Sequence, residues 1–156
     1  DVATFESGFS CAKFNNHYSN GSTPKDPQFC DTDFFLMRTA EAYLAYAEAT
    51  ARQNNGNTTT EGAAAINAIR SRAHTTTKSS YTVNEILDEW CREFYFEGRR
   101  RTDLIRFGKF GGNSDYKWQW KGGTFAGTNF SANLNIFAIP DTDMNANKNL
   151  VQNPGY

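Results

Sequence analysis

Three aromatic residues lie close together in one polar stretch of the sequence: Tyr116, Trp118 and Trp120. A flat aromatic face can stack on the C–H side of a pyranose, and amide groups can bind its hydroxyls. The amides nearest in sequence are Gln119, Asn113 and Asn129. These residue types predict a glycan-contacting surface. The same aromatic side chains could instead cover a helical core as a loop flap, because Trp and Tyr are commonly well buried.

Histidines and cysteines give no sign of a metal or cofactor site. His17 and His74 each stand without a second His or Cys at ligand spacing, so we predict no metal and no cofactor. Cys11, Cys30 and Cys91 form no metal pattern, and an odd number of cysteines cannot all pair internally. Two interpretations remain open, three small buried hydrophobic residues or a Cys11–Cys30 disulfide in an exported protein.

The charged residues argue against catalysis. A glycoside hydrolase needs two carboxylates about 5–10 Å apart across a cleft. The acids within 85–93 instead follow one expected helix, which predicts a solvated, salt-bridged face and no enzymatic activity. The arginine run 99–101 with Arg106 could bind an anionic group, but acids such as Asp103 at helical spacing favour a structural ion network.

Composition restricts the class of protein further. The 16 Lys and Arg residues nearly balance 17 Asp and Glu residues, so no net field favours a nucleic acid partner. A hydrophobic content of 38% is enough for the core of one globular domain. No apolar run approaches the roughly 20 residues of a membrane-spanning helix. The chain begins without Met, and we expect it to be a fragment of a longer protein.

Residue periodicity predicts two domain parts and a helical hairpin. Residues 1–30 are rich in turn-forming residues and predict an irregular segment, followed by a domain over 31–156. Within that domain, apolar residues at three-to-four spacing predict a helix over 34–53 and a second over 60–74. Small residues on both helices and a combined length near the tetratricopeptide repeat of about 34 residues predict a repeat-like pair.

Further elements follow this hairpin. Thr82 and Glu85 have the spacing of a capping box, which predicts a third helix, and a shorter helix is expected over 99–107. An apolar run over 135–140 predicts a short strand-like tail. The predicted fold class is mainly α, a tetratricopeptide-repeat-like helical hairpin plus further helices, with irregular aromatic-rich loops and a short C-terminal strand-like tail.

Several segments resemble the SusD/RagB family in both order and spacing. The matching segments are 33–44, 47–49, 65–73, 85–89, 96–108, 136–140 and 145–156. The resemblance is greatest to starch-type members, because Lys109-Phe110 followed by 118–123 is similar to their loop after the helix. Arg99 stands where the family motif commonly has His, and Trp90-Cys91 replaces a small or basic pair. Neither departure is expected to change the fold.

The resemblance implies a function without chemistry on the ligand. It implies capture of starch-like or other oligosaccharides and polysaccharides at the cell surface and delivery to a SusC-type TonB-dependent transporter in the outer membrane. It also implies a lipid anchor in the outer leaflet, attached through an N-terminal region outside this sequence, so Cys11, Cys30 and Cys91 are not anchor candidates. The main glycan contacts of starch-type relatives lie upstream of this stretch. The alternatives are a tetratricopeptide-like protein-interaction module and, less favoured, a glycoside hydrolase.

The predicted first helix carries apolar residues on more than one face. Phe34, Phe35, Tyr43 and Tyr46 are among them, whereas the second helix offers one narrow stripe of Ala and Ile. Repeat-like helix pairs need about three stacked units for stability. We therefore expect an uncovered apolar surface on the side of the first helix away from the second, covered by the missing N-terminal part of the same protein.

Overall fold

A computed structural model describes residues 4, 6, 11–112 and 115–156 of the chain. The chain divides into two compact units, one up to Arg38 and one from Thr39 to Tyr156, and each is described by itself. No helix in the described part of the chain is long and apolar enough to cross a membrane.

The first unit is irregular where it is described and is held by side-chain hydrogen bonds. The Asp31 carboxylate accepts hydrogen bonds from the Tyr18 hydroxyl at 2.7 Å and from the Lys25 amide at 2.9 Å. The Asn16 side chain donates to the Phe29 carbonyl at 3.1 Å and accepts from the Asp31 amide at 2.9 Å. Such bonds replace the backbone pairing that a helix or strand would supply.

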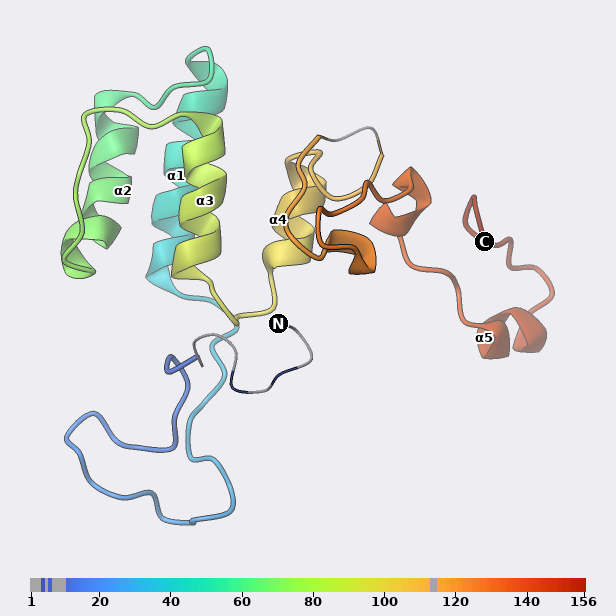
Figure 1. The fold of residues 1–156 in the computed structure, drawn as a ribbon, viewed down its shortest axis with the longest axis horizontal. Coiled ribbons are helices and arrows are strands. Elements are labelled where there is room, and N and C mark those ends of the chain that lie inside the picture. Colours follow the sequence, from blue (N-terminus) through green and yellow to red (C-terminus); the bar gives the residue numbers. More distant parts are fainter. Residues whose placement is uncertain (1–3, 5, 7–10, 113–114) are drawn as a thin grey trace. The chain divides into compact units, whose positions relative to one another are not determined.

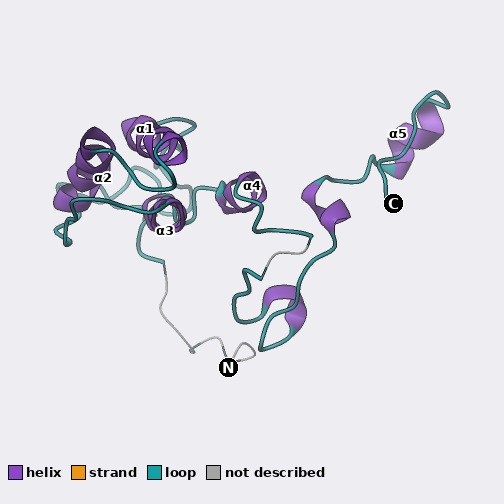
Figure 2. Ribbon diagram, turned by 90° about the horizontal axis from the view of Figure 1, so that it is seen from above, coloured by secondary structure: helices purple, strands orange, loops and turns teal. Residues whose placement is uncertain are grey.

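Three helices of the second unit lie side by side, α1 (Thr39–Gln53), α2 (Thr60–Arg72) and α3 (Val83–Glu93), as Figures 1 and 2 show. The helix α1 packs against both of the others. The contact is built mainly from small and aliphatic residues, because small side chains let helix axes approach closely. The buried apolar residues of α1 and α2 are Ala40, Leu44, Ala47, Ala51, Ala63, Ala65, Ile66 and Ile69. The mainly α fold with a helical hairpin is therefore confirmed.

The predicted start of the first helix, at residue 34, is wrong. The helix begins at Thr39, and Leu36 and Met37 before it are almost fully exposed. Ala40 is the first residue of the segment to be buried. Most helical stability in proteins comes from packing one face, and the exposed apolar residues at 34–37 do not bury a face that would extend the helix.

The remaining predicted boundaries are close to the observed ones. The Thr82 hydroxyl accepts from the Glu85 amide at 3.2 Å, and the Glu85 carboxylate accepts from the Thr82 amide at 2.8 Å, which confirms the capping box. Hydrogen bonds from Lys78 and Thr82 lower the pKa of Glu85 to about 2. The helix α2 ends at Arg72, two residues early, because His74 has a positive φ of 52°.

The second unit continues with α4 (Arg100–Arg106), two short 3-10 turns (Lys121–Gly123 and Ala132–Asn135) and α5 (Asp141–Ala146). The described residues form no β-strand, only two isolated bridges. The tail expected to be strand-like is extended at Ile136 but pairs with no neighbouring strand.

A buried carboxylate joins three of the helices. Glu48 on α1 is 4% exposed, and it accepts hydrogen bonds from Trp90 Nε1 on α3 at 3.0 Å, from Arg52 Nε at 2.8 Å and from Arg106 on α4. Burial alone raises the pKa of Glu48, but the bonds from Arg106, Arg52 and Trp90 outweigh burial and hold the pKa below its ordinary value. This carboxylate is therefore charged and fully engaged at neutral pH.

A second buried carboxylate, Asp103, completes the ion network. It accepts from Arg99 Nε at 3.0 Å and from Arg106 at 3.1 Å. The Arg99 guanidinium also pairs with Glu41 at 2.9 Å and lies 3.9 Å from the Trp90 ring centroid. The arginines flanking α4 are thus structural residues.

The acids of α3 are less solvated than predicted. Glu89 is buried and accepts from Arg70 at 2.6 Å and from Arg92 at 2.7 Å, and the nearly buried Glu93 pairs with Arg72 at 2.7 Å. The expectation of a solvated face is wrong for these two residues. The reason is tertiary, because the long arginine side chains of α2 reach across and cover the carboxylates.

We predict that Glu48→Gln lowers the free energy of unfolding by about 2 kcal/mol at pH 7, because two guanidinium groups lose their charged partner. The folded-state pKa of Glu48 is depressed, so its contribution is present above the unfolded value near 4.5 and is lost as pH falls through the lower folded pKa. Urea unfolding at pH 7 and pH 3 should show the difference from the native chain shrinking at pH 3.

The matched control is Asp88→Asn, which neutralises an exposed acid on α3. We expect it to change the unfolding free energy by less than about 0.5 kcal/mol at either pH. Equal effects of the two substitutions would contradict the central role of Glu48.

Candidate functional site

The predicted aromatic stretch forms a closed loop after α4, where the chain folds back on itself before α5 (Figure 1). The Thr128 amide donates to the Lys121 carbonyl at 2.9 Å, and the Gly112 amide donates to the Phe130 carbonyl at 2.9 Å. The Trp120 amide makes a longer bond to the Phe125 carbonyl at 3.3 Å. These bonds fix the backbone path of what we call the aromatic loop, residues 115–130.

The sequence-predicted residues have different environments within this loop. Trp118 is 38% exposed, Trp120 is 43% exposed, and Gln119 lies exposed between them in a turn. Tyr116 is half-buried, and Arg100 donates to its hydroxyl at 2.7 Å. Asn113 lies outside the described residues. The loop therefore leaves both indoles and the amide of Gln119 accessible to a ligand.

Ring contacts divide the aromatic residues into two groups. Trp118 makes edge contacts with Tyr116 at 6.1 Å and with Phe130 at 6.4 Å between ring centroids. Trp120 instead packs on Phe125 at 5.7 Å. The structure thus brings Tyr116 and Trp118 together and places Trp120 in a separate pair.

Two arginines fasten the loop and the chain after it to the helices. Arg100 donates to the Leu87 carbonyl of α3 at 3.1 Å in addition to the Tyr116 hydroxyl. Arg101 donates to the Leu134 carbonyl at 2.8 Å and lies 4.0 Å from the Phe137 ring centroid. The arginine run considered for anion binding is therefore occupied by protein groups.

Sequence reasoning missed the central residue of the loop, Lys121. This lysine is 1% exposed, and Nζ donates to the Tyr116 carbonyl at 3.0 Å. Burial lowers the pKa of Lys121, and the charge of Lys117 lowers it further. No sequence signal marks a buried lysine, because Lys is almost always at the surface.

The possible metal-binding side chains do not cluster in the described part of the chain. Cys11, Cys30 and Cys91 are free thiols, and Cys30 is exposed. Within the described ranges, no group of three or more His, Cys, Asp or Glu residues is arranged to hold a metal ion.

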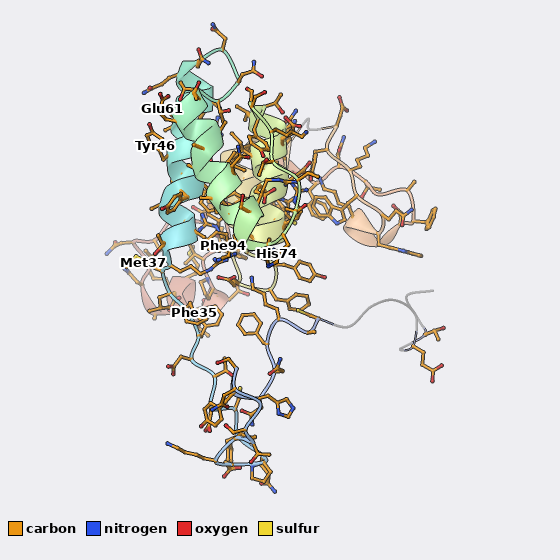
Figure 3. The ribbon with its side chains drawn as sticks, turned by 90° about the vertical axis from the view of Figure 1, so that its left-hand side faces the viewer. Phe35, Met37, Tyr46, Glu61, His74 and Phe94 are labelled. Atoms are coloured by element: carbon orange, nitrogen blue, oxygen red, sulfur yellow. The ribbon has the colours of Figure 1, made fainter. Side chains whose placement is uncertain are left out.

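An apolar groove of about 440 Å³ runs between α1 and α2. Figure 3 labels Tyr46 and Glu61 on this side of the helix pair. The groove is lined by Ala42, Tyr43, Tyr46, Glu61, Ala64 and Ala65. The sequence predicted an uncovered apolar surface on the side of α1 away from α2, whereas this groove includes α2. The small residues of α2 leave a shallow floor beside the two tyrosines, so α2 forms part of the exposed surface.

A second pocket, of about 530 Å³, lies between α2 and α3 and is mostly charged. Its residues are largely paired with one another, as in the Arg70–Glu89 pair at 2.6 Å and the Lys78–Glu85 pair at 2.6 Å. These pairs leave little unsatisfied charge for a ligand.

The architecture defines a class of protein, a helical hairpin scaffold carrying an aromatic loop with exposed indoles. The model of the SusD family matches residues 1–156, and the chain belongs to this family. The resemblance found in the sequence segments is thereby confirmed.

Individual relatives support the same assignment. The chain is 46% identical to the starch-binding protein SusD of Bacteroides thetaiotaomicron over 156 residues, which is 99% of this chain and 27% of that protein. Surface glycan-binding protein A from Bacteroides uniformis has a TM-score of 0.61 and 26% identity, covering 77% of this chain and 27% of the other. A SusD superfamily protein from Parabacteroides distasonis has a TM-score of 0.61 and 21% identity, covering 79% and 27%, and shows the fold alone. The chain thus spans only 27% of the length of these relatives.

We predict that Gly127→Ala disrupts the aromatic loop. Gly127 has a φ of +75°, and a Cβ there would collide with the Trp118 carbonyl oxygen. Gly123→Ala is the matched control, because its φ is +80° but nothing lies within 4 Å of the added Cβ. Both substitutions carry left-handed strain of about 1–2 kcal/mol, and only Gly127→Ala adds a steric clash.

Near-ultraviolet circular dichroism of the tryptophans reports the outcome. Gly127→Ala should reduce the signal clearly more than Gly123→Ala, while far-ultraviolet spectra show the helices intact in both. A loop that tolerates both equally would not have the backbone approach described here.

Proposed function

We propose that the protein captures glycans at the cell surface without converting them and delivers them to a SusC-type TonB-dependent transporter. The exposure of Trp118 and Trp120 on a backbone fixed by hydrogen bonds carries this proposal, with Gln119 between them. Membership of the SusD family and the similarity to proteins named for binding starch and surface glycans support it. Anchoring to the outer leaflet of the outer membrane belongs to the same proposal.

The carboxylates favour binding over hydrolysis. Glu48, Glu89 and Asp103 are buried, and each pairs with arginine. The pKa of Glu48 lies below its ordinary value, whereas a glycosidase acid needs a raised pKa to carry a proton at neutral pH. Each of these carboxylates is also fully used by structural hydrogen bonds.

Within this function, we assign Tyr116, Trp118, Gln119 and Trp120 to an additional glycan contact beside a main site upstream of this stretch. Trp118 and Trp120 supply stacking surface, Gln119 supplies an amide, and Tyr116 supports the ring of Trp118. The competing interpretation, a loop that only covers the core, predicts little loss of affinity when either indole is removed.

We predict that Trp118→Ala weakens maltoheptaose binding about tenfold, because a stacked ring contributes about 1–3 kcal/mol by analogy with nucleobase stacking. Isothermal titration calorimetry measures the affinity, and Trp120→Ala tests the second indole separately. The oligosaccharide should be recovered without new reducing ends. A loss below about 1 kcal/mol for both variants would leave the loop as a cover of the core.

We also propose that another helical segment of the same protein covers the α1–α2 groove. The groove is apolar, and Tyr46 at its edge is 51% exposed although it lies on a helix of the core. The relatives that are named for binding starch and surface glycans are several times longer than this chain. Their additional sequence is long enough to contain such a segment. If the chain is instead a tetratricopeptide-like interaction module, a peptide partner occupies the same groove.

In the full-length protein, Tyr46→Ala should lower the free energy of unfolding by about 2 kcal/mol, since the ring is then buried under the covering segment. The comparison is Tyr95→Ala, which removes a ring of similar exposure at the end of α3. Chemical denaturation measures the free energy of unfolding of both variants. A Tyr46→Ala effect below about 0.5 kcal/mol would show that the groove is open in the whole protein.

A further inference from the structure

Lys121 is an unusual residue because its ammonium is buried without a countercharge from the described part of the chain. Its side chain is almost fully enclosed, and among the described residues no carboxylate pairs with Nζ. The hydrogen-bond acceptors are two backbone carbonyls, Tyr116 at 3.0 Å and Lys109 at 3.5 Å. Burying a charge is costly unless it is compensated, so the surroundings of this ammonium must supply the compensation.

Two aromatic rings supply it. Lys121 Nζ lies 4.6 Å from the ring centroid of Trp118 and 5.1 Å from that of Phe130. The two rings are nearly perpendicular, at 89°. Both distances are within the range of about 6 Å for cation–π attraction, which strengthens when the cation is desolvated. The ammonium therefore attracts the same indole that the loop exposes to solvent.

The backbone of Lys121 also closes the loop. Its carbonyl accepts the Thr128 amide at 2.9 Å, and its amide donates to the Trp118 carbonyl at 3.1 Å. Lys109, one acceptor of the ammonium, lies in the chain that leaves α4, after Phe107 and Gly108. Lys121 thus links the chain after α4, the backbone of Tyr116 and the ring of Trp118.

The charge of Lys121 gives the site contacts that an aliphatic side chain of similar volume could not make. Burial and the neighbouring Lys117 lower the pKa of Lys121, so the site disfavours a cation unless it gains from the carbonyls and rings. An aliphatic residue would fill the same space without that cost, but it would neither donate to the Tyr116 carbonyl nor attract the indole.

We propose that Lys121 is a positioning residue of the glycan contact, whose buried ammonium holds the indole of Trp118 in one orientation before a ligand arrives. A preorganised ring loses little conformational freedom on binding, and this raises affinity without any contact between Lys121 and the sugar. The inference rests on the proposed function of the aromatic loop and adds the residue that orients it.

The first test compares Lys121→Met with Lys117→Met in the full-length protein. Met keeps the length and apolar character of the lysine stem, and Lys117 is an exposed lysine of the same loop, so both variants lose one charge. Lys121→Met should weaken maltoheptaose binding at least about threefold in calorimetry, through a less favourable entropy, and Lys117→Met, which removes a charge that repels the Lys121 ammonium, should not weaken it. Equal affinities of the two variants, with Trp118→Ala weakening binding, would overturn the proposal.

A second readout follows the indole without any ligand. In a Trp120→Phe background of the full-length protein, the share of neutral-acrylamide quenching that is lost on adding Trp118→Phe reports Trp118, and the third tryptophan of these 156 residues, Trp90, is buried. Lys121→Met should increase quenching and reduce the near-ultraviolet dichroism, while the helical melting profile stays that of the parent. An indole unchanged by Lys121→Met would contradict positioning whether or not the loop binds glycans.

Lys121→Gln keeps the inference testable if Lys121→Met does not fold. It removes the charge that the two rings attract but keeps a side-chain N–H donor at this position. The proposal expects the same direction in both readouts, weaker binding and greater quenching of Trp118. If Trp118→Ala leaves affinity unchanged while Lys121→Met still frees the indole, the glycan contact fails and the positioning of Trp118 stands.

Discussion

The burial of Glu48 is the constraint on which the second unit depends. Its carboxylate accepts from an indole of α3 and from guanidinium groups of α1 and α4, so three helices meet at one charge. Removing any donor leaves a buried charge partly unsatisfied, which makes the arrangement cooperative. Asp103 extends the network through Arg99 and Arg106 and fixes the orientation of α4.

The position of α4 in turn determines where the aromatic loop begins. Arg100 and Arg101, in the first turn of α4, reach Tyr116 and Leu134, so the helix holds the loop at one of its first residues and also holds the chain that follows the loop. Inside the loop, a buried ammonium replaces a hydrophobic core. Trp118, Trp120 and Phe125 are exposed in this short irregular segment, and one cation with carbonyl and ring partners gives it a defined centre.

The family assignment and the local chemistry support the same two roles, one for the helices and one for the aromatic loop. The helices supply a scaffold whose charged residues pair internally, and the loop supplies the exposed aromatic surface to which we assign the proposed glycan contact. Neutral sugars need flat apolar faces and amide partners more than strong charge. The near balance of 16 basic and 17 acidic residues agrees with a surface that does not rely on long-range electrostatic attraction.

The sequence alone determined the features that depend on neighbours within a few residues: the helical hairpin, the Thr82–Glu85 capping box and the Arg99–Asp103 pair. Only the tertiary structure decided that α1 begins at Thr39, that Glu89 is buried and that the apolar groove includes α2. It also decided the burial of Lys121. Hydrophobic periodicity and capping are local and can be read along the chain, whereas burial of a charge depends on partners far away in sequence, such as Trp90 for Glu48.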